Sequence, residues 1–195
     1  MSSPRTPGPV PKSSAMDKML ASRSAARRIA LVLMDVDGVM TDGGIVFMDR
    51  RAEGRVFDAK DGVGIWLLHR AGILTGVISG RGSAAVRRRT RELGMKEVHL
   101  NARDKLRVYK TILRRRRLTD SAVCYIGDDL VDLAVLGRVG LSVAVADAHP
   151  EVRRAAGLVT RAPGGKGAVR EVADLILNSQ GKMEPLLEKL RGTES

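Results

Sequence analysis

The chain of 195 residues carries a formal net charge of +12, with 44% hydrophobic residues, 3% aromatic residues and 21 glycines. This length suits one globular domain plus tails, and the core must be aliphatic because aromatic side chains are scarce. No apolar run approaches the roughly 18 residues of a membrane span, so no membrane partner is expected. The single cysteine, Cys124, cannot form a disulfide within the chain, which predicts a buried structural thiol in a cytoplasmic protein.

Two tails flank the predicted domain. Residues 1–25 contain four prolines among serines and basic residues, without apolar clustering, which predicts a disordered basic tail. Residues 26–182 hold the alternating apolar runs of the domain. Residues 183–195 form a C-terminal tail with a short helical segment.

Basic residues are concentrated in residues 1–28 and in two predicted helices, at 87–91 and 114–117. Consecutive arginines point in different directions around a helix, which favours solvated helix faces over a nucleic-acid-binding stripe. Aromatic side chains for base stacking are also scarce, so a nucleic-acid partner is not expected. The positive charge would also help to attract an anionic substrate.

The most informative stretch is Asp35-Val36-Asp37-Gly38, which follows the apolar run 29–34. Such a run is typical of a strand buried on both faces, and ligands bind at the ends of these strands. Asp35 is the candidate nucleophile, and Asp37 is the candidate general acid and then base. Two close carboxylates require a cation, which predicts a divalent metal. The tetrapeptide alone also fits a tight turn or part of a calcium loop.

The next segment predicts a β-hairpin and a helix. Residues 45–48 and 53–58 are expected to be extended, and they flank a polar turn at 49–52. Asp61 is expected to cap a helix over 62–71, which Gly72 ends.

Two later positions offer phosphate ligands. Ser79 ends a buried strand at 73–78, and its hydroxyl suits a phosphate oxygen, although Ser79-Gly80-Arg81-Gly82 also fits a plain turn. After a short strand at 97–100, Lys105 opens a helix to about residue 117, where the helix dipole disfavours a cation. This suggests that its ammonium group holds the phosphate and the nucleophile, and the alternative is an ordinary surface lysine.

Acidic residues follow a fourth strand at 122–126. Asp128 is predicted to bind Mg²⁺ directly, with Asp129 and Asp132 fixing metal-bound waters; Asp129 also fits a helix N-cap. Strands near 141–146 and 158–160 and a helix over 168–180 continue the alternation. We therefore expect an α/β fold, a three-layer Rossmann-like doubly wound parallel sheet with a β-hairpin flap and no cap domain.

The motifs resemble those of the haloacid dehalogenase superfamily of phosphotransferases, in the same order. They are Asp35-Val36-Asp37-Gly38-Val39, Ser79, Lys105, and Gly127-Asp128-Asp129 with Asp132. Within the superfamily, residues 28–182 resemble the family of phosphatases that act on 3-deoxy-D-manno-octulosonate 8-phosphate. The stretches 144–148 and 164–171 are part of this resemblance. This implies that a small sugar-acid phosphate is hydrolysed through an aspartyl-phosphate.

The resemblance also implies a set of ligands. Mg²⁺ would be bound by Asp35, Asp128 and the backbone carbonyl of Asp37, while Ser79 and Lys105 would hold the phosphate. The candidates for binding the sugar acid are Lys60 and Arg81. At the position of Lys60, members of this family often carry arginine.

The spacing of the motifs leaves no room for a separate lid domain, because Asp42 lies 37 positions before Ser79, and Ser79 lies 26 before Lys105. A lidless site still has to exclude water and position its substrate. A hairpin from a neighbouring copy could do so, and the resemblance implies a tetramer. We therefore expect a homo-oligomer, a tetramer assembled through the 45–58 hairpin.

Two other functions stay open. The chain could be a phosphatase for another sugar acid, such as a nonulosonate 9-phosphate, on the same scaffold. It could also be a non-catalytic regulatory domain of the same fold. The presence of Asp35, Asp37, Lys105 and Asp128 together favours an enzyme.

Overall fold

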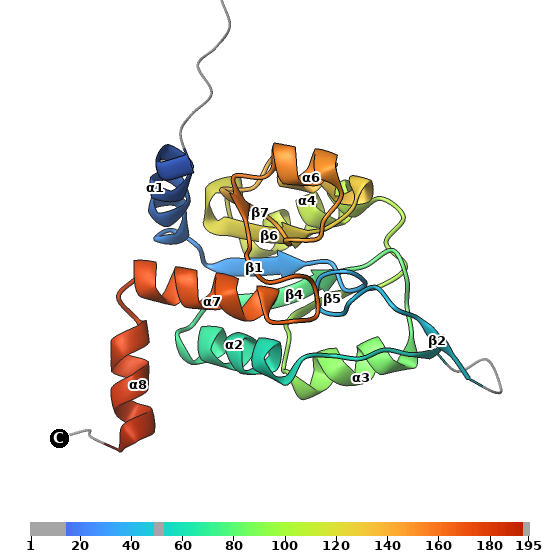
Figure 1. Ribbon diagram of the computed structural model, residues 1–195, viewed down its shortest axis with the longest axis horizontal. Helices are drawn as coiled ribbons and strands as arrows, with labels where there is room; N and C mark the ends of the chain where they lie inside the picture. Colours follow the sequence, from blue (N-terminus) through green and yellow to red (C-terminus); the bar gives the residue numbers. More distant parts are fainter. Residues whose placement is uncertain (1–14, 49–52, 193–195) are drawn as a thin grey trace, which may run out of the picture.

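The computed structural model describes residues 15–48 and 53–192. In this part of the chain six parallel strands form one sheet, in the order β5-β4-β1-β6-β7-β8 (Figure 1). The strands are β1 (Leu31–Met34), β4 (Leu74–Ile78), β5 (Glu97–His99), β6 (Val123–Gly127), β7 (Leu141–Ala144) and β8 (Leu158–Val159). Because β1 pairs with both β4 and β6, it lies at the centre of the sheet, and the predicted doubly wound topology is confirmed.

Helices cover both faces of the sheet and give the predicted three layers (Figure 1). One face carries α2 (Ala59–Arg70), α3 (Ala84–Glu92) and α7 (Ala168–Ser179), and the other carries α4 (Lys105–Arg116), α5 (Leu133–Leu136) and α6 (Pro150–Ala155). The chain changes face between β5 and β6, so the crevice between the ends of β1 and β6 is a topological switch point. None of the described helices is long and apolar enough to cross a membrane.

Burial of the central strand β1 on both faces explains why its sequence is continuously apolar. All four residues of β1 are fully buried, because helices cover the sheet on both sides. The core around it is mainly aliphatic, as the composition predicted, and each fully buried leucine or valine contributes about 1.5–3 kcal/mol. This packing fixes the ends of β1 and β6, where the polar loops begin.

The N-terminal prediction is wrong over part of its range. Residues Ala15–Ala26 form helix α1 instead of continuing the disordered tail predicted for 1–25. Ala26 is fully buried, and the side chain of Gln180 donates a hydrogen bond to its carbonyl oxygen at 3.0 Å. This helix has no clear apolar pattern, because the side chains that it buries are the small ones of Ser22, Ala25 and Ala26. Residues 1–14 lie outside the described part of the chain.

The C-terminal helical segment is confirmed as α8 (Met183–Arg191), which follows α7. The side chain of Lys182, at its start, donates a hydrogen bond to the carbonyl oxygen of Ala71 at 3.0 Å. This bond ties the start of α8 to the end of α2. Residues 193–195 lie outside the described part of the chain.

The hairpin is confirmed as an antiparallel pair, β2 (Val46–Phe47) and β3 (Glu53–Gly54), and its predicted turn at 49–52 lies outside the described residues. Helix α2 begins earlier than predicted, because Asp58 rather than Asp61 is its N-cap and accepts a hydrogen bond from the Lys60 N–H at 2.6 Å. Asp61 is instead buried and accepts the backbone N–H of Arg170 at 2.8 Å. It therefore ties α2 to the start of α7.

Candidate active site

A cavity of about 360 Å³ lies at the C-terminal edge of the sheet. Its lining comes from the loops after β1, β4 and β5 and from the turn after β6, so the parallel strands bring distant parts of the sequence together. The lining residues are Asp35, Asp37, Ser79, Gly80, Arg81, Ala102, Arg103, Lys105 and Val131. The four side chains predicted to be catalytic therefore share one cavity.

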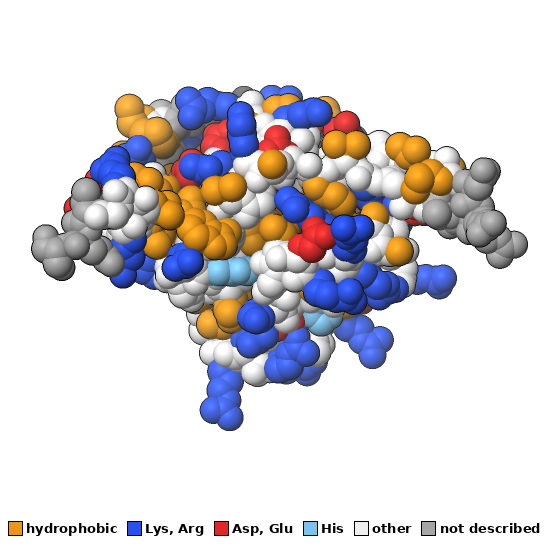
Figure 2. All heavy atoms as spheres, turned by 90° about the horizontal axis from the view of Figure 1, so that it is seen from below, with side chains coloured by type: hydrophobic (Ala, Val, Ile, Leu, Met, Phe, Trp, Pro, Cys, Tyr) orange, Lys and Arg blue, Asp and Glu red, His pale blue; other side chains and the backbone are white. Residues whose placement is uncertain are grey.

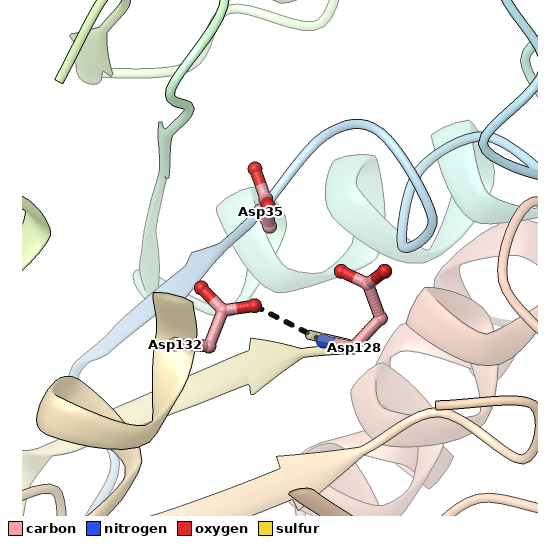
Figure 3. Close-up of side chains that lie close together, drawn as sticks. All are labelled: Asp35, Asp128 and Asp132. Atoms are coloured by element: carbon pink, nitrogen blue, oxygen red, sulfur yellow. Dashed lines mark hydrogen bonds between the residues drawn. The ribbon is translucent and has the colours of Figure 1, made fainter. Parts of the chain in front are cut away.

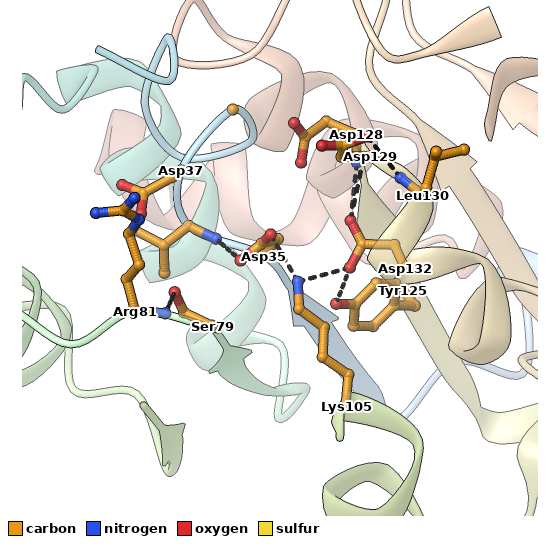
Figure 4. Close-up of polar contacts among 12 residues, drawn as sticks. Asp35, Asp37, Ser79, Arg81, Lys105, Tyr125, Asp128, Asp129, Leu130 and Asp132 are labelled. Atoms are coloured by element: carbon orange, nitrogen blue, oxygen red, sulfur yellow. Dashed lines mark hydrogen bonds and ion pairs between the residues drawn. The ribbon is translucent and has the colours of Figure 1, made fainter. Parts of the chain in front are cut away.

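Lys105 is the central cation of the site (Figure 4). Its Nζ donates to Asp35 Oδ2 at 2.6 Å and to Asp132 Oδ1 at 2.7 Å, and its side chain is 4% exposed. Burial alone would lower the pKa of Lys105, but the charges of Asp35 and Asp132 outweigh it and raise the pKa. These contacts explain why a lysine is stable in the first turn of α4, where the helix dipole opposes it.

Three carboxylates converge between the ends of β1 and β6 (Figure 3). Oxygen atoms of Asp35, Asp128 and Asp132 lie within 4.8 Å of one another. Burial raises the pKa of Asp35 to about 6 despite the opposing charge of Lys105. Burial and the charges of Asp35 and Asp132 raise the pKa of Asp128 to about 7. One lysine cannot balance three carboxylates, so the cluster favours binding a further cation.

Asp128 is the carboxylate that best fits a metal. Its Oδ1 is buried and has no hydrogen-bond partner among the described residues. Asp35 Oδ1 accepts the Val36 N–H at 2.6 Å while Oδ2 accepts Lys105, which leaves lone pairs on both oxygens. Hard oxygen donors of this kind suit Mg²⁺, so the residues present fit the predicted ion.

Asp132 has a different role in the structure. Oδ1 accepts hydrogen bonds from Lys105 and from the Tyr125 hydroxyl, and Oδ2 accepts the backbone N–H groups of Asp128 and Asp129. These four bonds make Asp132 an anchor for Lys105 and for the loop that carries Asp128. The contribution of Tyr125 was missed, because this residue lies inside the apolar run of β6 and gave no separate signal.

Asp37 is paired with a residue that the sequence analysis also missed. Arg55, just after β3, donates from Nε to Asp37 Oδ1 at 2.6 Å and from Nη1 to Glu53 Oε2 at 3.0 Å. The side chain of Arg55 is 0% exposed, and that of Asp37 is 20% exposed. The hairpin therefore contributes directly to the site.

The remaining predicted site residues differ in whether they line the cavity. Ser79 is buried, and its Oγ accepts the Arg81 N–H at 3.2 Å, so its own hydrogen is available to a ligand in the cavity. Arg81 lines the cavity, whereas Lys60 is exposed in the first turn of α2 and is not among the lining residues. Asp129 is exposed and accepts the Leu130 N–H at 2.7 Å, so the predicted N-cap is confirmed.

Glycines allow the loops around the site to approach closely. Gly38 has φ +91°, and a Cβ there would lie 2.1 Å from Asp128 Oδ2. A Cβ on Gly164 would lie 1.9 Å from the carbonyl oxygen of Gly38. The loop before α7 therefore packs directly on the Asp37-Gly38 loop, and any larger residue would displace one of them.

Comparison with known proteins agrees with this geometry. Residues 94–171 match the family described as haloacid dehalogenase-like hydrolase. The chain is 45% identical over 159 residues to 3-deoxy-D-manno-octulosonate 8-phosphate phosphatase KdsC from Yersinia pestis, with 82% of this chain and 85% of that protein covered. The crystal structure of the Yersinia pestis phosphatase has a TM-score of 0.83 and 43% identity, covering 84% of this chain and 89% of that chain.

A second solved structure carries ligands. The Moraxella catarrhalis 3-deoxy-D-manno-octulosonate 8-phosphate phosphatase, in complex with a magnesium ion, a phosphate ion and KDO, has a TM-score of 0.85 and 34% identity. The match covers 90% of this chain and 99% of that chain. The chain thus belongs to the haloacid dehalogenase-like hydrolases, in the family of the 3-deoxy-D-manno-octulosonate 8-phosphate phosphatases.

Proposed function

We propose that this protein hydrolyses 3-deoxy-D-manno-octulosonate 8-phosphate with Mg²⁺, through an aspartyl-phosphate on Asp35. The protein is a phosphoric monoester hydrolase by its family. The observation that carries the proposal is the Lys105 ammonium group between Asp35 and Asp132, beside the unpartnered Asp128 Oδ1. This arrangement is suited to receiving a phosphoryl group, whose negative charge needs fixed cations around it. A location in the cytoplasm remains a prediction.

Asp35 is oriented for nucleophilic attack. The Val36 N–H and Lys105 Nζ each hold one of its oxygens at 2.6 Å, so the carboxylate cannot rotate freely. In the first step an oxygen of Asp35 forms a bond to phosphorus, and the bond from phosphorus to the sugar oxygen breaks. Asp37 gives its proton to the leaving sugar oxygen.

The second step regenerates the enzyme. Asp37 takes a proton from water, the water oxygen attacks phosphorus, and the Asp35 carboxylate leaves as inorganic phosphate forms. In both steps the Ser79 hydroxyl and Lys105 Nζ donate to phosphoryl oxygens, because both line the cavity next to Asp35. Arg81, on the same wall, is proposed to bind the carboxylate or hydroxyl groups of the sugar acid. A contact between Lys60 and the sugar stays a prediction.

Asp35, Asp128 and the backbone carbonyl of Asp37 are the proposed Mg²⁺ ligands. When bound, the ion neutralises phosphoryl charge and orients the group for in-line transfer. Asp132 keeps its four hydrogen bonds and positions Asp128, and Asp129 remains a cap next to the site. A role for Asp129 and Asp132 in fixing metal-bound waters stays a prediction.

Phosphate release across a panel of sugar phosphates tests the proposed function. With Mg²⁺, 3-deoxy-D-manno-octulosonate 8-phosphate should give the highest kcat/KM, and a nonulosonate 9-phosphate should be a poorer substrate. Chelation should abolish turnover while the circular dichroism spectrum is kept, because the core does not depend on the ion. Higher kcat/KM for the nonulosonate, or full activity after exhaustive chelation, would contradict the proposal.

We also propose that copies of the chain assemble through the hairpin into a homotetramer. Val46, Phe47, Met48 and Val56 are 54%, 76%, 52% and 67% exposed. Figure 2 shows hydrophobic side chains beside the hairpin at the right end of this face, and a larger group toward the opposite end. A two-stranded hairpin is marginally stable alone and presents edges that invite further pairing. Burial between copies would remove this apolar surface from water.

Replacing Val46 and Val56 with lysine should therefore yield smaller species in analytical ultracentrifugation and lower activity. Both positions are exposed in the single chain, so the fold should survive. Leu190→Lys on α8, where the leucine is 57% exposed, is the matched control and should leave the assembly unchanged. A wild type that sediments as a monomer at micromolar concentration yet turns over at full rate would refute the assembly.

A further inference from the structure

Arg55 is an unusual residue for a surface hairpin. It directly follows β3, yet its side chain is 0% exposed and is held between two carboxylates. Its Nε lies 2.6 Å from Asp37 Oδ1, and its Nη1 lies 3.0 Å from Glu53 Oε2. An arginine is rarely buried without partners, so this pairing fixes its position. The pair joins the hairpin to a residue that lines the cavity.

The two oxygens of Asp37 are bound unequally. Oδ1 accepts the short bond from Nε, whereas Oδ2 lies 3.5 Å from Nη2, at the limit of a hydrogen bond. Oδ2 is therefore the oxygen with free lone pairs. The guanidinium has donors only and stays protonated under ordinary conditions. It can hold Asp37 without competing for the proton that Asp37 transfers.

We propose that Arg55 is a positioning residue that fixes Asp37 so that Oδ2 carries the proton to the leaving sugar oxygen and later takes one from water. This inference rests on the proposed function, in which Asp37 is the acid and base. The chemistry is unchanged: the proton leaves Asp37 Oδ2 as the phosphorus–oxygen bond breaks, and it is replaced when water attacks.

The hairpin thereby has a second role beside assembly, which is to hold Arg55 in position. Glu53 pairs with Phe47 across the two strands and holds Nη1, so the position of the guanidinium depends on the formed hairpin. Loss of hairpin order should release Asp37 even when every other residue of the site is intact. Proton transfer, rather than phosphate binding, would then be the step that suffers.

A double-mutant cycle with two leaving groups tests the inference. An alkyl leaving group needs the acid, whereas p-nitrophenolate leaves without one. Arg55→Met should slow phosphoryl transfer from the sugar phosphate by about 10²-fold, measured by rapid quench, because general acids contribute about 10²–10⁴-fold. The first-turnover burst of p-nitrophenolate should change by less than about 3-fold. In an Asp37→Asn background, adding Arg55→Met should cost nothing further, since the group it positions is already lost.

Two more variants separate positioning from folding. Arg55→Lys keeps the charge but loses the planar arrangement of donors, and it should restore part of the rate. Arg154→Met, at an exposed arginine paired with Glu151 on α6, is the control and should match the wild type. Equal loss with both leaving groups, or a further loss in the Asp37→Asn background, would overturn the inference and make Arg55 structural.

Failure of the proposed function would give a different result from failure of this inference about Arg55. A wild type that cleaves p-nitrophenyl phosphate but not the sugar-acid phosphate would overturn the proposed substrate alone. The same comparison on another alkyl phosphate that the enzyme accepts would then decide the role of Arg55. A wild type inactive on every phosphate ester would overturn both.

Discussion

Replacing Asp35 with asparagine should lower kcat by about 10⁴-fold or more while leaving the fold intact. The amide is a poor nucleophile and a weaker metal ligand, and its nitrogen cannot accept the hydrogen bond that Lys105 now donates at 2.6 Å. The substitution keeps the size of the side chain in a tightly packed loop. Phosphate release at saturating Mg²⁺, with the melting temperature measured in parallel, checks the expectation.

A matched control is available on the surface. Glu184→Gln, which also converts a carboxylate to an amide, affects an exposed ion pair with Arg191 on α8 and should leave kcat unchanged. Near-normal phosphate release from Asp35→Asn would exclude Asp35 as the nucleophile. Unfolding of that variant would make the kinetic result uninformative, so the melting curve belongs to the same experiment.

Lys105→Met should impair both activity and stability. Removal of the ammonium group leaves Asp35 and Asp132 buried without their cation, and breaking a buried ion pair in this way costs about 3–5 kcal/mol. For a chain of this length that corresponds to a fall in melting temperature on the order of 10 °C. Turnover should fall by about 10²–10³-fold, because a donor to the transferred phosphoryl group is lost.

Added Mg²⁺ should raise the melting temperature of Lys105→Met more than that of the wild type, since the ion would supply part of the missing positive charge. Lys110→Met, at an exposed lysine on the same helix, removes an equal charge and should change neither quantity. Differential scanning calorimetry with and without Mg²⁺ measures both effects. An unchanged melting temperature for Lys105→Met would show that the buried network does not stabilise the fold.

Much of the architecture could be predicted because its signals are local. The continuous apolar runs of β1, β4 and β6 are typical of strands in a covered parallel sheet, and carboxylates directly after such strands must meet at one edge. The order of Asp35, Ser79, Lys105 and Asp128 along the chain then predicted which residues meet at the site, and it indicated the family. The structure and the comparisons confirm the fold and the family.

Other features depend on contacts between distant segments, which a local pattern does not show. No sequence motif pointed to Arg55, and its contact with Asp37 is formed only in the folded chain. Asp61 was assigned to the nearest helix start, whereas its hydrogen bonds are made to α7, 109 positions away at Arg170. The hydrogen bond from Tyr125 to Asp132 was not predicted, because the tyrosine ring fits the apolar pattern of β6 and its hydroxyl group leaves no separate signal in the sequence. These three cases concern the partner of a polar group, whereas the strands of the main sheet lie where their apolar runs predicted them.

Identification of the phosphorylated residue tests the central claim most directly. Enzyme mixed with ³²P-labelled sugar phosphate and Mg²⁺, then quenched in acid within one turnover, should carry an acid-stable, hydroxylamine-sensitive label. Peptide mapping should place this label on Asp35, and Asp35→Asn should show none. Rapid turnover with no covalent label, or a label on another residue, would contradict a mechanism that proceeds through Asp35.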